Sequence, residues 1–384
     1  MSKIIPNIVE VFTGKFPKEY QNTFPYFGFF SQEEIEKNKG KLLMLDFDFG
    51  RYCSLNCPGC FRKSNIVDDI QSGDLTYDEI VKIIDEAMPM GLRMIKICGA
   101  GEPIQNSKFL QFLQDMTQRN IGVAVFTKGQ ALGSDEEAIK FNKTYGINSA
   151  QELCERLFKL KVSFMLSFQS FDTEKQDRLV GNIKGHALVR NQALINLVNA
   201  GFTKTNPTRL ALELGPIVKE NYDEIFDLYV YARRRNMYLI PNFLMVSGKQ
   251  IDKEFLKKYD LSKKQKYDLF MKIYFWNIEN GIQTINQIKK EGISCMPGIH
   301  PCNQVACGLY ITAKGNVVGC PGFTETEGNV RNKTIKDIWE KSQNRRLRAG
   351  IFNCKCPPKD GITIPVQLYE QVLKELELKY DNRK

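Results

Sequence analysis

The sequence predicts an α/β fold: a partial barrel of six parallel strands alternating with helices, (β/α)6, followed by a small cysteine-rich domain. Two observations lead to this prediction. Residues 42–250 contain six strand-like apolar runs that alternate with helical segments, a pattern typical of parallel βαβ units. Beyond residue 290 the composition changes, and six of the eleven cysteines fall within residues 295–356. Parallel barrels carry their active sites at the C-terminal ends of the strands.

The elements follow in order. The first strand-like run, residues 42–49, ends in alternating apolar and acidic residues, and the expected strands are residues 42–49, 94–98, 123–126, 161–168, 210–214 and 237–244. The expected helices are residues 76–88, 109–119, 150–160, 188–200 and 222–235, with a further lysine-rich helical stretch at 261–290. In the first helix Tyr77, Ile80 and Ile84 share one face, and Thr76 or Asp74 can cap its start.

Composition narrows the class of protein. A chain of 384 residues with 42% hydrophobic and 26% charged residues is long enough for a barrel and a smaller domain. No apolar run approaches the roughly 20 residues that span a bilayer, and residues 1–6 lack a signal-peptide core, so a cytoplasmic location without membrane partners is expected. Eleven cysteines then favour metal or reactive thiols over disulfides. The net charge of +10 would suit an anionic partner, but the lysines are dispersed among glutamates, so a nucleic acid is not expected.

Three thiols follow the first expected strand, at Cys53, Cys57 and Cys60. They can hold three corners of one metal cluster and leave the fourth corner open for chemistry. Small zinc sites also use clustered thiolates. Zinc knuckles usually pair two CxxC motifs or add histidine, and neither His186 nor His300 is near in sequence.

This loop resembles that of the radical S-adenosylmethionine (SAM) enzymes, in which three cysteines bind a [4Fe-4S] cluster and SAM chelates the fourth iron. The resemblance implies a partial TIM barrel, reductive cleavage of SAM to a 5′-deoxyadenosyl radical, and abstraction of a substrate hydrogen. It also implies a flavodoxin- or ferredoxin-type electron donor. Gly59 stands where the family often has an aromatic residue, with Phe61 following the third cysteine instead, and both are candidate cofactor contacts.

Further SAM contacts are implied at three other strand ends. The segment Gly99-Ala100-Gly101-Glu102-Pro103 fits a tight turn equally well by composition, but in this position it resembles the family's GGEP element, which contacts the SAM amino group. Thr127 belongs to a turn similar to the family's TNG turn, and Ser167 resembles the residue that contacts the SAM ribose. Glu213 is a weaker candidate, for which an outward-facing strand residue is the better interpretation.

The second group of thiols includes Cys302, Cys307, Cys320, Cys354 and Cys356, with Cys295 just before it. A closed zinc site is one interpretation. Residues 309–320 are expected to form a hairpin turning at residues 314–316. This block resembles the SPASM/twitch extension of radical SAM enzymes, in its shorter form with one auxiliary [4Fe-4S] cluster. The candidate ligand sets are Cys302, Cys320, Cys354 and Cys356, or the same set with Cys307 in place of one of the last two. Cys295 is a ligand, a hydrogen donor to a substrate radical, or a buried side chain.

The domain organisation follows from these assignments. An aromatic segment, residues 1–41, is expected to pack on the barrel or its mouth. It precedes the barrel (42–250), a helical linker (251–294), the twitch/SPASM-like domain (295–358) and a C-terminal helix (359–384).

Three functions are compatible with the sequence. The first is an enzyme that modifies a peptide or protein side chain by oxidation, crosslinking or epimerisation, with a separate peptide-recognition protein as a further partner. The second is a radical dehydrogenase or epimerase of a sugar, aminocyclitol or nucleotide. The third is a non-catalytic iron-sulfur or zinc protein.

Overall fold

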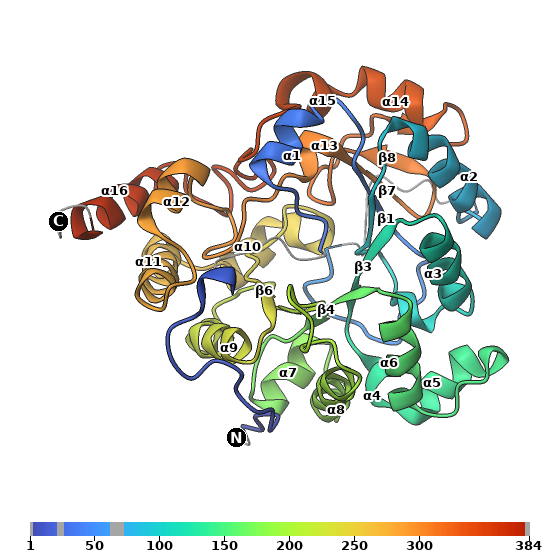
Figure 1. The fold of residues 1–384 in the computed structure, drawn as a ribbon, viewed down its shortest axis with the longest axis horizontal. Helices are drawn as coiled ribbons and strands as arrows, with labels where there is room; N and C mark the ends of the chain where they lie inside the picture. The colour runs from blue at the N-terminus through green and yellow to red at the C-terminus, as the bar shows by residue number, and fades with distance from the viewer. Residues whose placement is uncertain (1–2, 21–26, 62–72, 381–384) are drawn as a thin grey trace.

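The computed structural model describes residues 3–20, 27–61 and 73–380. At its centre is a nine-stranded sheet in the order β6-β5-β4-β3-β2-β1-β7-β8-β9. Its first six strands are β1 (Met44–Phe47), β2 (Met94–Ile97), β3 (Gly122–Thr127), β4 (Ser163–Ser167), β5 (Leu210–Glu213) and β6 (Tyr238–Ile240). They are parallel and adjacent in chain order, and Figure 1 shows them surrounded by helices. This arrangement is the predicted partial barrel.

The outer helices pack apolar faces on the strands. The five predicted ones are α2 (Tyr77–Ala87), α3 (Phe109–Gln118), α6 (Ala150–Lys159), α8 (His186–Asn199) and α9 (Tyr222–Arg234). Helix α2 buries Ile80, Ile83, Ile84 and Ala87. The predicted cap at Thr76 is confirmed, since its hydroxyl accepts a hydrogen bond from the Glu79 amide while the Glu79 carboxylate accepts one from the Thr76 amide.

Several helices differ from the prediction. Short helices that the sequence pattern did not indicate are α1 (Gln32–Lys37), α4 (Gln130–Gly133), α5 (Asp135–Asn142), α7 (Thr173–Leu179) and α10 (Lys253–Tyr259). The stretch expected to be helical at residues 261–290 is helical over most of its length. It divides into α11 (Lys263–Glu279) and α12 (Ile285–Glu291), because Gly281 adopts a left-handed φ of +80° that ends the first helix.

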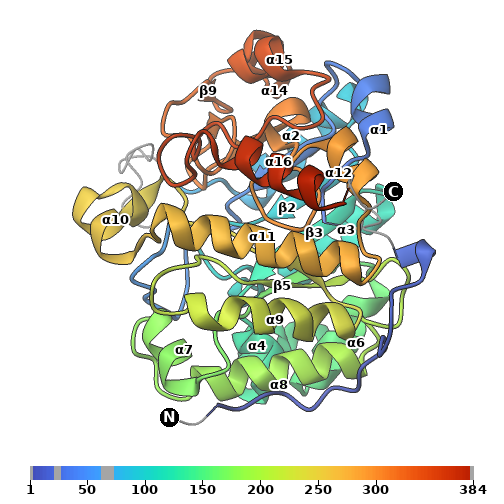
Figure 2. The ribbon, with the colours of Figure 1, turned by 90° about the vertical axis from the view of Figure 1, so that its left-hand side faces the viewer.

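The C-terminal block continues the barrel sheet. The predicted hairpin is present as β7 (Gly308–Ile311) and β8 (Asn316–Val318), followed by β9 (Gly328–Asn329). Strand β7 pairs in parallel with β1, Met44 lying opposite Gly308. The remaining elements are α13 (Gln304–Cys307), α14 (Ile335–Lys341), α15 (Gln343–Arg348) and α16 (Leu368–Tyr380). In Figure 2 these orange and red elements cover one side of the barrel.

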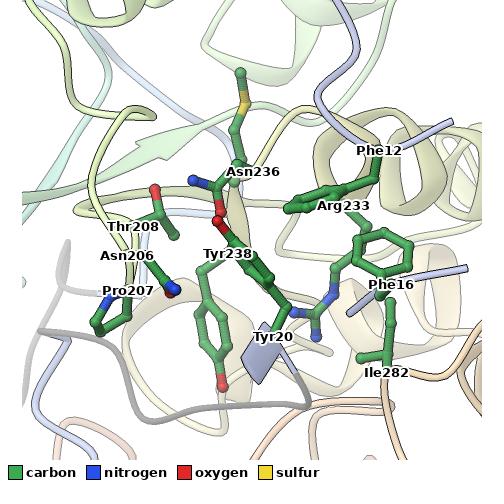
Figure 3. Close-up of a pocket in the computed structure, with 11 residues that line it drawn as sticks. Phe12, Phe16, Tyr20, Asn206, Pro207, Thr208, Arg233, Asn236, Tyr238 and Ile282 are labelled. Carbon is green, nitrogen blue, oxygen red and sulfur yellow. The ribbon is translucent and has the colours of Figure 1, made fainter. Parts of the chain in front are cut away.

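The N-terminal segment follows the opposite side (dark blue in Figure 2). Its aromatic rings pack together, Phe12 lying 4.7 Å from Phe16 and 4.5 Å from Tyr20 between ring centroids. They line a pocket of about 40 Å³ at the N-terminal ends of β5 and β6, with Phe12, Phe16 and Ile282 on one side and Asn206, Pro207 and Thr208 on the other (Figure 3). This pocket holds no more than a few waters. Phe24 and Tyr26, which belong to the same predicted aromatic segment, lie outside the described residues.

None of the helices in the described parts of the chain has the length and apolarity that crossing a bilayer requires.

Candidate functional site

A cavity of about 470 Å³ lies at the C-terminal ends of the barrel strands. Its walls include all three thiols of the first cysteine loop and every predicted SAM contact. They also include four thiols from the C-terminal block. The residues brought together in this way are Cys53, Cys57, Gly59, Cys60, Phe61, Gly99, Gly101, Glu102, Thr127, Ser167, Cys295, Cys302, Cys320 and Cys356. Of the predicted ligands, Cys307 and Cys354 are not among the lining residues.

The first cysteine loop is held by the loop that follows β2. The Ser54 amide donates to Gln105 Oε1 at 3.1 Å, and Gln105 Nε2 donates back to the Ser54 hydroxyl at 2.9 Å. The Glu102 amide donates to the Tyr52 carbonyl at 2.7 Å. The thiol positions therefore depend on the glycine-rich segment as well as on their own loop.

The two glycines of that segment permit this close approach. A Cβ atom built on Gly101 would lie 2.5 Å from the Tyr52 carbonyl oxygen, and one on Gly99 would lie 2.6 Å from the Asp48 Cα. Both neighbours are backbone atoms, which cannot rotate away. Any side chain at either position would displace the backbone that carries the first thiols.

Glu102 joins three of the predicted SAM contacts. Its side chain is buried and accepts hydrogen bonds from the Thr127 hydroxyl at 2.6 Å and from the Lys128 amide at 2.8 Å. Lys128 Nζ in turn donates to the Ser167 hydroxyl at 2.7 Å. Burial raises the pKa of Glu102 to about 7, although these hydrogen bonds lower it. A cation placed beside this carboxylate would favour its ionised form.

Glu213 faces the cavity, which corrects the outward orientation expected from the sequence. Its Oε1 accepts a hydrogen bond from the Gly215 amide at 2.9 Å, while its buried Oε2 has no hydrogen-bond partner among the described residues. Burial raises the pKa of Glu213 to about 8. Glu213 lies opposite Ser167 in the parallel ladder, so both side chains point to the same side.

The sequence analysis missed a buried ion pair between β1 and β2. Lys96 Nζ lies 3.4 Å from Asp46 Oδ2, both residues line the cavity, and the Cys98 thiol donates weakly to the same oxygen at 3.8 Å. Burial raises the pKa of Asp46 to about 6, against the lowering effect of Lys96. The sequence does contain an indication of this pair, because an acidic residue lies in one apolar strand and a basic residue lies in the next. Unpaired charges are rare at such buried positions.

The thiols of the C-terminal block fall into two groups. Cys295, Cys302, Cys320 and Cys356 face the cavity, and a hydrogen bond from the Cys295 thiol lowers the pKa of Cys356 to about 7. The two others point elsewhere, since Cys307 Sγ donates to the Asn303 carbonyl and Cys354 Sγ donates to the Ile351 carbonyl, each at 3.3 Å. Four thiols of this block therefore share one chamber with the first three.

The donor chemistry of the cavity suits iron-sulfur clusters. Eight thiols line it: the three of the first cysteine loop, four of the C-terminal block, and Cys98 at the end of β2. Thiols are soft ligands of the kind that iron-sulfur clusters and zinc select. Burial, with a contribution from the Glu102 charge, raises the pKa of Cys53 to about 11, so a metal cation must replace its proton on binding. Within residues 3–20, 27–61 and 73–380, no three His, Cys, Asp or Glu side chains converge closely enough to hold a single metal ion.

Family comparisons agree with this geometry. The model of the radical SAM superfamily matches residues 47–229, and that of the SPASM iron-sulfur cluster-binding domain matches residues 302–357. Together the two matches cover more than half of the chain. This chain therefore belongs to the radical SAM superfamily. Within that superfamily, it is one of the members that carry a SPASM domain, so it binds SAM with a [4Fe-4S] cluster and has an additional iron-sulfur cluster-binding domain.

Individual relatives are distant. The chain is 24% identical over 310 residues to the tungsten-containing aldehyde ferredoxin oxidoreductase cofactor-modifying protein of Pyrococcus furiosus, over 75% of this chain and 78% of the relative. It is 22% identical over 322 residues to mycofactocin maturase MftC of Mycolicibacterium smegmatis, over 81% of this chain and 73% of the relative. Among solved structures, Streptococcus suis SuiB bound to precursor peptide SuiA matches with a TM-score of 0.56 at 17% identity, over 82% of this chain and 69% of that one. At this identity the likeness shows the fold.

Proposed function

We propose that this protein is a radical SAM enzyme that abstracts a hydrogen atom from a peptide or protein side chain and so produces an oxidised, crosslinked or epimerised residue. The observation that carries the proposal is that one cavity is lined by the three thiols of the first cysteine loop, by four thiols of the C-terminal block and by the hydrogen-bond network around Glu102. SuiB, which shares this fold, has been solved with its precursor peptide SuiA bound, and this supports a peptide substrate for the present chain.

The residues would divide the work as follows. Cys53, Cys57 and Cys60 would hold the first cluster, which together with SAM supplies the 5′-deoxyadenosyl radical. Glu102 would accept hydrogen bonds from the SAM ammonium group, because it is the glutamate of the predicted GGEP element and its carboxylate is buried. Ser167 would bind the ribose, oriented by its hydrogen bond from Lys128.

For the auxiliary cluster, the cavity supports the set Cys295, Cys302, Cys320 and Cys356. We propose it in place of the two sets expected from the sequence, since Cys354 and Cys307 donate to backbone carbonyls and are not among the residues that line the cavity. In this proposal Cys295 would be a ligand and would not serve as a hydrogen donor to substrate.

The barrel would also exclude water from the radical. Phe27 and Phe29, from the N-terminal segment, are buried on the cavity wall, and Phe27 stacks on Tyr238 with ring centroids 5.5 Å apart. Apolar rings offer no hydrogen bonds to water and no polar group that competes with the substrate. They would frame an extended peptide along this wall.

The test is anaerobic iron and sulfide quantitation on reconstituted protein, followed by a dithionite assay for 5′-deoxyadenosine. The Cys53/Cys57/Cys60→Ala triple variant is the comparison. We expect about eight irons in the wild type and about four in the variant, with deoxyadenosine formed only by the wild type. Failure of the intact, loaded protein to cleave SAM would overturn the enzyme proposal and favour a non-catalytic iron-sulfur protein.

A small-molecule substrate is the second candidate. One relative is named for modifying a cofactor, and such a substrate would occupy the same cavity. Deoxyadenosine formation stimulated by a co-encoded peptide would favour the first candidate, and stimulation by a small molecule alone would favour the second.

A further inference from the structure

Helix α15 and its surroundings present a cationic surface, here named the α15 patch and made up of Lys39, Lys341, Arg345, Arg346, Leu347, Arg348 and Ile351. Between Glu340 and Asp360 the sequence contains six lysines and arginines and no carboxylate. Lys39 belongs to the same surface because it packs against Gly350. Helix α15 lies at the outer edge of the molecule in Figures 1 and 2.

The charges of the α15 patch are not neutralised locally. Among the described residues, none of its lysines or arginines forms an ion pair, and the adjacent carboxylate of Glu340 lies 3.9 Å from Lys336 instead. Arg345 donates to the Gly40 carbonyl and Arg348 donates to the Asn344 side chain. Both acceptors are uncharged, so the positive charges of the two arginines are not neutralised. This surface therefore carries a positive potential that attracts anionic partners from a distance.

Exposed apolar side chains lie among these charges. Leu347 is 58% exposed and Ile351 is 47% exposed. Aliphatic side chains surrounded by charges are typical of protein-protein docking sites, where the apolar residues provide contact and the charges orient the partner.

The inner side of α15 covers the auxiliary thiols. Helix α15 packs on α13, which begins two residues after Cys302. Asn344 of α15 lies so close to Gly319, the neighbour of Cys320, that a Cβ on Gly319 would be 1.6 Å from Asn344 Nδ2. One short helix therefore separates the exposed patch from two of the four thiols.

We propose that the α15 patch is the docking site of an acidic one-electron carrier protein of the flavodoxin or ferredoxin class. This inference rests on the proposed function, because it assigns the electron partner of the auxiliary site. In each productive encounter the reduced carrier would lose one electron, which the auxiliary cluster would relay to the first cluster, where it would serve the one-electron cleavage of SAM; no atom would be transferred to or from the carrier. The α15 patch lies apart from the candidate active site, since none of its residues is among those that line the cavity.

The variant that tests the proposal is Lys341→Glu/Arg346→Glu. Both side chains are exposed and form no ion pair with any part of the chain that the structure describes, and Lys341 lies in the last turn of α14. The matched control is Lys159→Glu/Lys204→Glu, which changes net charge equally on the barrel, with Lys159 in the last turn of α6. The probes are the flavodoxin and the ferredoxin encoded by the same organism, and binding is measured by biolayer interferometry at several salt concentrations.

We expect the patch variant to bind the carrier about tenfold more weakly at low salt, with a flatter salt dependence, while the control stays within about twofold of the wild type. Carrier-driven deoxyadenosine formation should slow about tenfold, whereas dithionite-driven formation should not change. Equal weakening in both variants, or no carrier binding by the wild type, would overturn the proposal. Weakened binding of a substrate peptide with unchanged carrier binding would reassign the patch to the peptide. If the wild type does not cleave SAM with dithionite as the reductant, the proposed function itself is overturned.

Discussion

Replacing Gly101 by alanine should disable the first cofactor site while leaving most of the fold intact. The new methyl group would lie 2.5 Å from the Tyr52 carbonyl oxygen and 3.0 Å from both the Arg51 carbonyl carbon and the Gly50 oxygen. All three are backbone atoms of the loop that carries Cys53. The clash can be relieved only if that loop and the glycine-rich segment move apart.

The cost has two parts. Overpacking at a tight site destabilises by about 1–3 kcal/mol, and separation of the two loops loses the hydrogen bond from the Glu102 amide to the Tyr52 carbonyl, worth about 1 kcal/mol. The sum of about 2–4 kcal/mol, if it falls on the SAM-bound state, raises the Kd for SAM roughly 30- to 900-fold.

The assay is equilibrium dialysis of SAM with anaerobically reconstituted Gly101→Ala protein, together with its iron content and urea unfolding of the metal-free form. Gly14→Ala is the control, because a Cβ on Gly14 has no atom within 4 Å. A Gly101→Ala protein whose SAM Kd stays within threefold of the wild type, with the same urea midpoint, would refute the close-approach argument.

Three further predictions concern the same cavity. Cys295→Ala should lower the iron content by about four atoms while Cys354→Ala leaves it unchanged, and the reverse pattern in iron assays would show that the ligand set is wrong. Lys96→Met should destabilise the metal-free protein by about 3–5 kcal/mol, because the buried Asp46 carboxylate loses its cation; urea unfolding measures this, and the Asp46→Asn/Lys96→Met double variant should recover part of the loss. The pKa of Glu213 is raised from its ordinary 4.5 to about 8, so Glu213 stays protonated to a higher pH in the folded state than in the unfolded state. The contribution of Glu213 to the free energy of unfolding therefore becomes more unfavourable as the pH rises from about 4.5 to 8. Glu213→Gln should therefore gain stability relative to the wild type across this range in urea titrations of the metal-free form, and a constant difference between the two proteins would contradict the burial argument.

The barrel could be predicted from the sequence because its strands are buried on both faces. Such strands appear as short continuous apolar runs, and β1 to β6 all overlap the expected ranges. Short helices such as α4 and α7 have too few residues to show a helical period, and their positions depend on the turns that precede them. The helical pattern of residues 261–290 does not show where the helix is interrupted, because the interruption depends on the left-handed backbone conformation of Gly281.

The position of the first three thiols on the cavity wall was predictable because all three belong to one loop. Cys53, Cys57 and Cys60 are close in sequence, so their spacing alone brings them together. The choice among Cys295, Cys307 and Cys354 depends on which way each thiol points, and that is decided by local turns and by packing across the sheet. The Asp46–Lys96 pair and the orientation of Glu213 depend on strand register, which the sequence does not state.

The pairing of β7 with β1 makes the two iron-sulfur parts of the chain inseparable in practice. Strand β1 leads directly into the first cysteine loop, and β7 occupies the edge of β1 that the barrel itself leaves open. Cutting the chain ahead of β7 would leave a row of unpaired amides and carbonyls on the strand that precedes the first cysteine loop. Such a shortened barrel would be prone to edge-to-edge aggregation, and swapping the C-terminal block between family members would require a donor strand that fits this edge.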